Sequence, residues 1–185
     1  MPQMPTIIIC PGIHPAELTD LFVRELQKQI PANYFVLSTE TDAPYSAIAI
    51  SQWLDRQPLA KTEPLCWIAF SAGVVGSIGA AIRWKLQGGQ IGCLIAVDGW
   101  GMPLAADFPI YRISHDYFTH WSSGLLGGGT QGFYADPDVE HLDLWRSPTN
   151  ISGWLATAPG CRTRMTLTDY LAQAIEQNQS QSIKH

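Results

Sequence analysis

One serine in this sequence follows an apolar run and precedes small residues, a setting in which a hydroxyl can act as a nucleophile. Residues 65–70 read Leu-Cys-Trp-Ile-Ala-Phe, and Ser71 comes directly before Ala72 and Gly73. A serine on a tight strand-to-helix turn projects its hydroxyl above the sheet edge, and such a turn needs small neighbours such as Ala69 and Gly73. The N-terminus of the following helix would stabilise an anion that forms there. The pattern therefore predicts an acyl-transfer nucleophile at Ser71.

Ser71 also has a purely structural interpretation. The segment from Ala69 to Gly73 departs from the pattern Gly-x-Ser-x-Gly at its first position, and short motifs of this kind occur by chance. Serine is among the favoured N-cap residues of helices. An ordinary helix cap after a buried strand is therefore the alternative to a nucleophile.

Strand and helix patterns alternate along the chain. Strands are predicted at residues 6–10, 34–37, 65–70, 91–97, 109–114 and 131–135, and helices at 15–30, 45–54, 72–86 and 165–177. This alternation implies an α/β fold with a three-layer, doubly wound, mostly parallel sheet. The length of 185 residues suits one domain over residues 1–185, with a flexible tail from about residue 178.

Polar residues follow several of the predicted strands. In open parallel sheets, ligands bind beyond the carboxyl ends of the strands. The candidates at those ends are Gly12-Ile13-His14, Ser71, Asp98, His115-Asp116 and His141. A binding or catalytic site is expected where they meet.

These segments resemble the α/β-hydrolase family in a small, lidless form like that of cutinases and compact esterases. The resemblance covers most of the chain and depends on the serine turn, on Pro-Gly-Ile-His at residues 11–14, and on the order Ser71, Asp116, His141. Residues 108–116 resemble the family's penultimate strand, which ends on the acid. Residues 133–142 resemble its last strand and histidine loop.

The sequence departs from the family pattern at three places. The first glycine of the serine motif is Ala69, no His-Gly pair precedes the expected oxyanion loop, and the link from Asp98 to Pro109 is very short. This short link leaves no room for a cap domain, so the resemblance implies an open site.

The resemblance implies a catalytic triad. A serine hydroxyl needs a histidine to take its proton, and the histidine needs an acid to orient it. We assign Ser71 as nucleophile, His141 as general base and Asp116 as acid. Asp98 also ends a predicted strand and is the alternative acid, because some lipases of this family carry the acid one strand earlier.

Two backbone amides, those of Ile13 and Ala72, are expected to form the oxyanion hole. Trp100, Trp121 and Trp145 lie near the expected site loops and are candidate pocket walls, although core packing explains them equally well. The glycine-rich segment 122–130 lacks the ending of a phosphate-binding loop and is interpreted as a mobile loop beside the site.

Composition narrows the function classes. The net charge is −5, and Lys and Arg are scattered, which argues against nucleic acid as a partner. The four cysteines are far apart and show no metal-binding spacing, so a cytoplasmic protein with reduced thiols, without metal or cofactor, is expected. The apolar run at residues 7–10 is too short for a signal peptide or a membrane span.

The sequence therefore predicts a serine hydrolase that acts on a small-molecule ester or thioester, most simply a carboxylesterase or thioesterase. An acyltransferase would use the same residues. The alternative from another class is a non-catalytic ligand-binding protein of the same fold, since a fold does not decide a function.

Overall fold

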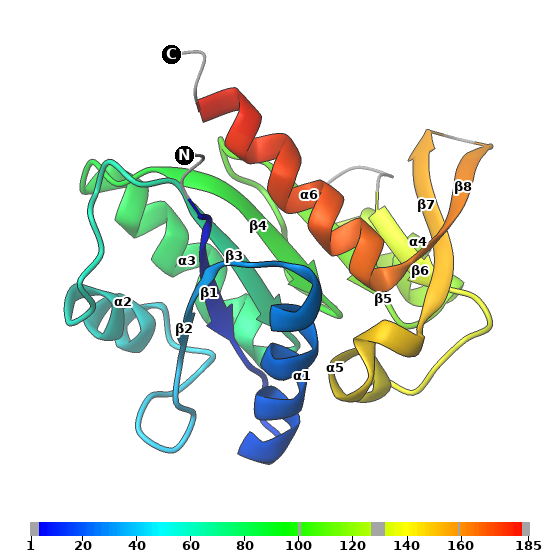
Figure 1. Cartoon of the computed structure of the whole chain (residues 1–185), viewed down its shortest axis with the longest axis horizontal. Coiled ribbons are helices and arrows are strands. Elements are labelled where there is room, and N and C mark those ends of the chain that lie inside the picture. The colour runs from blue at the N-terminus through cyan, green and yellow to red at the C-terminus, as the bar shows by residue number, and fades with distance from the viewer. Residues whose placement is uncertain (1–3, 100, 127–131, 159, 183–185) are drawn as a thin grey trace.

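The computed structural model of the chain describes residues 4–99, 101–126, 132–158 and 160–182. An eight-stranded sheet runs through the protein in the order β2-β1-β3-β4-β5-β6-β7-β8 (Figure 1). In chain order the strands are β1 (Thr6–Cys10), β2 (Asn33–Val36), β3 (Leu65–Phe70), β4 (Ile91–Val97), β5 (Ile110–Ser114), β6 (Gly132–Ala135), β7 (Ser152–Ala158) and β8 (Cys161–Thr166). Neighbouring strands are parallel from β2 to β6, and β7 and β8 are antiparallel to their neighbours.

Helices cover both faces of the sheet, as expected for an α/β fold. They are α1 (Ala16–Gln29), α2 (Ala47–Asp55), α3 (Ala72–Leu86), α4 (Tyr117–Gly124), α5 (Asp143–Arg146) and α6 (Leu167–Ser182), with a 3₁₀ turn η1 (Pro148–Asn150). Residues of α1, α5 and α6 pack into the core on one face, and residues of α2 and α3 pack into the core on the other. Figure 1 shows α1 and α6 in front of the sheet and α3 behind it. The α/β class with a mostly parallel sheet is therefore confirmed.

Continuous apolar runs form the centre of the sheet. Every residue of β1 and β3 is buried, and so is every residue of β4 after Ile91. A strand with helices on both faces exposes neither side to water, so both sets of alternating side chains are apolar. These runs place the carboxyl ends of β1, β3 and β4 side by side at one edge of the sheet.

The second half of the chain differs from the sequence-based expectations. The antiparallel hairpin β7–β8 was not predicted, nor was α4, which occupies part of the expected glycine-rich loop. The last helix continues to Ser182 instead of ending at Gln177, and the buried Asn178 side chain donates to the carbonyl of Ala174 and to the hydroxyl of Tyr111. The remainder of the glycine-rich segment, residues 127–130, lies outside the described residues, and so does Gln131.

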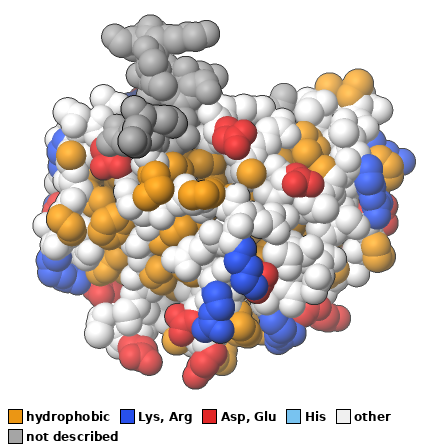
Figure 2. Space-filling model, viewed as in Figure 1, with side chains coloured by type: hydrophobic (Ala, Val, Ile, Leu, Met, Phe, Trp, Pro, Cys, Tyr) orange, Lys and Arg blue, Asp and Glu red, His pale blue; other side chains and the backbone are white. Residues whose placement is uncertain are grey.

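Basic and acidic side chains are interspersed on the face shown in Figure 2, which has the same orientation as Figure 1. Among the described residues, no helix has both the length and the apolar character needed to cross a membrane.

Candidate active site

Ser71 lies on the turn between β3 and α3 and has an unusual backbone conformation. Its φ and ψ are 51° and −118°. Positive φ costs free energy for a residue that carries a Cβ, and such strain persists only where the surrounding structure holds it in place. The Ser71 amide donates to the carbonyl of Val97 (2.9 Å), and its carbonyl accepts from Val74 (3.0 Å). The backbone of β3, β4 and α3 therefore fixes this serine at the sheet edge.

Two glycines allow the chain to pass close to Ser71. A Cβ built on Gly73 would lie 2.3 Å from the carbonyl oxygen of Cys10 and 2.5 Å from that of Pro11. A Cβ on Gly12 would lie 3.1 Å from the Cβ of Ser71. The loop after β1 therefore runs directly against the serine turn, as a tight strand-to-helix turn requires.

Asp98 follows β4 and is the buried acid of this edge. Its side chain is only 2% exposed. Oδ1 accepts from the amide of His115 (3.0 Å), and Oδ2 accepts from Nδ1 of His115 (2.7 Å) and from Nδ1 of His141 (2.6 Å). A carboxylate only accepts hydrogen bonds, so this network assigns the proton of each neutral imidazole to Nδ1. Nε2 of His141 is then free of a proton and able to accept one.

His141 lies in the loop after β6 and stacks on an aromatic column. Its ring is 4.6 Å from that of Phe70, which is 5.0 Å from Trp145, and Trp145 is 3.7 Å from Phe22. Phe70, Trp145 and Phe22 are all buried. The imidazole is therefore held between a buried carboxylate at its edge and a rigid apolar surface on its face.

The structure pairs His141 with Asp98 and not with Asp116, which the sequence analysis expected to contact it. Asp116 is the N-cap of α4, where Oδ1 accepts from the Thr119 amide (2.6 Å), and its Oδ2 lies 3.5 Å from Nε2 of His115. Burial raises the pKa of Asp116, but the hydrogen bonds from Thr119 and the nearby His115 outweigh it and leave that pKa below its usual value. His141 is bonded to Asp98, so the alternative acid occupies the position expected for Asp116.

His115 is a member of the site that the sequence analysis did not assign. It directly follows β5, beside the end of β4, and it donates twice to Asp98. The sequence did hold a signal for this role, because His115 follows the strand that neighbours the one before Asp98. The second histidine and the backbone amide hold the carboxylate in one orientation.

A pocket of about 380 Å³ opens above these groups. It is lined by Ser71, Asp98, His115, Phe118, Thr119 and His141, and we call it the serine pocket. The structure therefore brings together three of the residues expected at the site, Ser71, His141 and Asp98. Asp116 does not line this pocket.

The expected oxyanion residues lie on the two sides of the serine turn. Ala72 is the first residue of α3, and Ile13 follows Gly12 in the loop that packs against Ser71. The side chain of Ile13 is 74% exposed, so its place in this loop is not explained by core packing.

None of the tryptophans expected as pocket walls is among the described residues that line the serine pocket. Trp145 is fully buried and supports Phe70, while Trp121 is exposed and lines a second pocket behind α4. Trp100 lies outside the described residues.

The same acid and histidines also form a group that could hold a metal ion. Asp98, His115 and His141 each offer a ligand atom, and these atoms all lie within 4.8 Å of one another. Imidazole and carboxylate groups are ligands of zinc and of other divalent transition metals. In the structure, both imidazoles donate from Nδ1 to Oδ2 of Asp98.

In comparisons with known proteins, no family model matches this chain and no curated protein matches it significantly.

Proposed function

We propose that the protein is a serine hydrolase of the α/β-hydrolase type, acting on a small ester or thioester through an acyl-enzyme on Ser71. The single observation that carries the proposal is the hydrogen bond of 2.6 Å between Nδ1 of His141 and the buried carboxylate of Asp98, in a pocket that Ser71 also lines. A buried acid on Nδ1 orients a histidine as a base at Nε2 and stabilises the imidazolium that forms.

In the proposed reaction, Oγ of Ser71 attacks the acyl carbonyl while Nε2 of His141 takes its proton. The negative charge that develops on the carbonyl oxygen is stabilised by the amides of Ala72 and Ile13. His141 then gives its proton to the leaving alcohol or thiol, and Ser71 carries the acyl group. A water molecule, deprotonated by His141, releases the acid and restores the serine.

Asp98 is the acid of this triad, and His115 positions it. Since Asp98 is 2% exposed at its side chain and accepts three hydrogen bonds from His115 and His141, its charge is held where the imidazolium forms. Asp116 has a structural role at the start of α4.

The form of the serine pocket favours small substrates. His141 is 41% exposed at its side chain, so its edge is open to the solvent, and the ring of Phe118 gives the pocket an apolar wall. We therefore propose that the substrates are esters or thioesters with short acyl chains, hydrolysed in solution without a lipid–water interface. We also propose a reducing, cytoplasmic location, in keeping with the four cysteines, which are free thiols.

A fluorophosphonate probe tests the proposal directly. It should label the folded wild-type protein at Ser71, as located by peptide mass spectrometry, and should fail to label Ser71→Ala. Ser122→Ala is the matched control, because its hydroxyl donates to the Thr119 carbonyl on α4 (3.4 Å) and its loss should leave labelling unchanged. A folded wild-type protein that is not labelled would favour a non-catalytic ligand-binding protein.

A further inference from the structure

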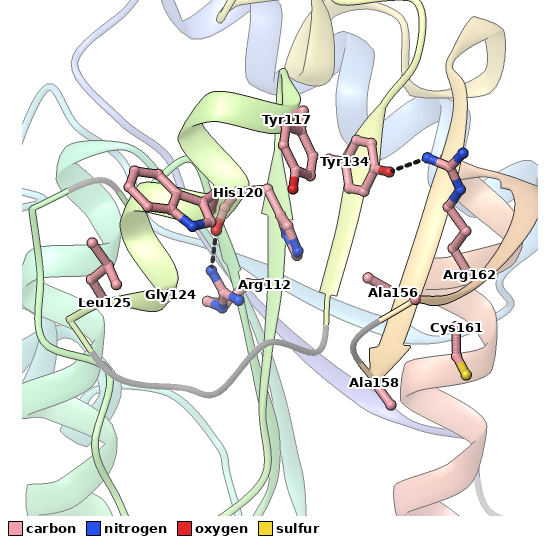
Figure 3. Close-up of a pocket in the computed structure, with 12 residues that line it drawn as sticks. Arg112, Tyr117, His120, Gly124, Leu125, Tyr134, Ala156, Ala158, Cys161 and Arg162 are labelled. Carbon is pink, nitrogen blue, oxygen red and sulfur yellow. Dashed lines mark hydrogen bonds between the residues drawn. The ribbon is translucent and has the colours of Figure 1, made fainter.

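A second pocket lies on the other side of α4 from the serine pocket. It has a volume of about 500 Å³ and lies between α4, the strands β5 and β6, and the hairpin β7–β8 (Figure 3). Side chains that line it include Arg112, Tyr117, His120, Tyr134 and Arg162, and we call it the arginine pocket. It shares no lining residue with the serine pocket. Its volume is in the range of about 300–1000 Å³ that is usual for small-molecule sites.

The charge of the arginine pocket is opposite to that of the whole protein. Arg112 and Arg162 line it, and among its described lining residues there is no Asp or Glu, although the chain has a net charge of −5. Guanidinium groups remain protonated in proteins. The pocket is therefore a local positive region.

Arg112 lines this region from β5. It is 2% exposed, and its Nη1 donates to the carbonyl of His120 (2.9 Å) and to Oγ of Ser123 (2.7 Å). Burial lowers the pKa of Arg112, because removing water disfavours the charged form. The carbonyl and the hydroxyl orient the guanidinium, which contributes positive charge to the wall of the pocket.

Arg162 faces the same cavity from β8 and is held by two aromatic residues. Its Nη1 donates to the hydroxyl of Tyr134 (3.3 Å), and its Cζ lies 4.5 Å from the centre of the Trp154 ring. Figure 3 shows this hydrogen bond across the pocket, with Tyr117 and Tyr134 side by side. An arginine that is oriented in advance loses less side-chain entropy when it binds an anion.

Aromatic faces form the walls between the two arginines. The ring of Tyr134 lies 5.2 Å from that of Tyr117 and 5.1 Å from that of His120. Opposite them, Ala156, Ala158 and Gly160 have small or no side chains and leave the space open. Such walls suit a flat apolar body, and arginines pair with carboxylate or phosphate oxygens.

We propose that the arginine pocket binds a small organic anion with a flat or aromatic body that carries a carboxylate or phosphate group. The ligand lies against Tyr117 and Tyr134, with its anionic group toward Arg162. This site is separate from the chemistry at Ser71, so the proposal stands whether or not the protein is a hydrolase.

The experiment measures the binding of phenyl phosphate by isothermal titration calorimetry to the Ser71→Ala protein, in which no product of serine chemistry can form. Benzyl alcohol is the neutral control. We expect phenyl phosphate to bind at least tenfold more tightly than benzyl alcohol, and to bind more weakly as salt is added. Equal binding of the two compounds, or no binding of phenyl phosphate at millimolar concentration, would overturn the proposal.

Arg162→Gln should weaken the binding of phenyl phosphate about tenfold, because one charge-assisted hydrogen bond is lost. Arg164→Gln is the matched control. Arg164 is on the same strand and near the same Trp154 ring (5.1 Å), but it pairs with Asp136 (3.0 Å) and does not line the pocket. Its loss should change the affinity less than twofold, and equal effects of the two variants would contradict the proposed site.

Cys161 provides an independent measurement of where the ligand binds. It is the exposed cysteine of the four, and it lines the arginine pocket. Saturating phenyl phosphate should slow the reaction of Cys161 with a disulfide reagent severalfold in the folded protein. An unchanged rate would place any bound phenyl phosphate elsewhere and refute the assignment to this pocket.

Discussion

Helix α4 separates two pockets that differ in chemistry. On one side, the serine pocket has a buried carboxylate and two histidines beside a serine. On the other, the arginine pocket has two guanidinium groups and, among its described lining residues, no acid. Phe118 and Thr119 of α4 face the first pocket, whereas Tyr117, His120 and Trp121 face the second.

The two pockets differ in the chemistry that their side chains can support: proton transfer in the serine pocket and recognition of a charged group in the arginine pocket. Imidazoles that are oriented by a carboxylate can accept and donate protons during bond making and breaking. Arginines do not give up their protons and suit the binding of a fixed negative charge. One helix thus lines both the proposed reaction site and the proposed binding site, and changes in one pocket should leave the other intact.

The largest expected effect is at the acid of the serine pocket. Asp98→Asn replaces one carboxylate oxygen with an NH₂ donor, so the three N–H groups that now donate to Asp98, the amide and Nδ1 of His115 and Nδ1 of His141, no longer all have an acceptor oxygen in place. We expect kcat for p-nitrophenyl butyrate to fall by roughly 10⁴. Asp116→Asn should cost less than about tenfold, since it caps α4. The reverse order of damage in folded proteins would restore Asp116 as the acid, and a loss of phenyl phosphate binding in Asp98→Asn would show that the pockets are coupled.

The second largest effect on activity is expected at Phe70, on whose ring His141 stacks. Phe70→Leu removes the ring on which His141 stacks, and we expect kcat to fall about tenfold as the imidazole loses its position. The unfolding free energy should also fall, by ~1–2 kcal/mol. Phe133→Leu is the matched control, because Phe133 is equally buried in the same core but stacks on Tyr170.

Denaturation and kinetics together distinguish these two variants. Both should lose similar stability, but Phe133→Leu should keep its kcat. If the two variants lost the same activity, the effect of Phe70 would be one of general core packing and not of histidine position.

A smaller effect, on stability, is expected at Asp116, the N-cap of α4, the helix that lines both pockets. Asp116→Ala should lower the unfolding free energy at pH 7 by ~1 kcal/mol. Because the pKa of Asp116 in the folded protein is lowered, its contribution is present above the unfolded value of about 3.9 and is lost as the pH falls through the folded value. Urea denaturation at pH 7 and pH 3 should show the cost of the variant shrinking at the lower pH.

Ser46→Ala is the control for that pH dependence. The Ser46 hydroxyl caps α2 by accepting from the Ala49 amide (3.2 Å), and it does not titrate. Its cost should be similar at both pH values. A parallel change in the two variants would mean that the pH effect does not come from Asp116.

No effect is expected from a chelator. Dialysis against EDTA should leave kcat and phenyl phosphate binding unchanged if Asp98, His115 and His141 act as a hydrogen-bonded group. Activity that is lost with EDTA and returns with zinc or manganese would assign these three residues to a metal centre instead.

The central strands could be predicted from the sequence, but the hairpin at the edge could not. The runs at 6–10, 65–70 and 91–97 are apolar throughout, which is what burial on both faces demands, and the strand predictions there are confirmed. In β8, Arg162 and Arg164 are exposed and in β7 most residues are only half-buried, so neither has such a run. The Pro159-Gly160 dipeptide was the available signal of a turn.

The sequence by itself determined that Ser71 ends a buried strand at the start of a helix, and that Asp98, Asp116 and His141 follow strands at the same sheet edge. Local sequence decides this because strand and helix patterns are local. Only the tertiary structure decided which carboxylate meets His141. Asp116 follows β5 as the N-cap of α4, where its carboxylate accepts a hydrogen bond from the Thr119 amide. Asp98 lies at the end of the strand beside that of Ser71, where burial and two imidazoles hold it. These contacts join Asp98 to residues 17 and 43 positions further along the chain, and no local pattern encodes them.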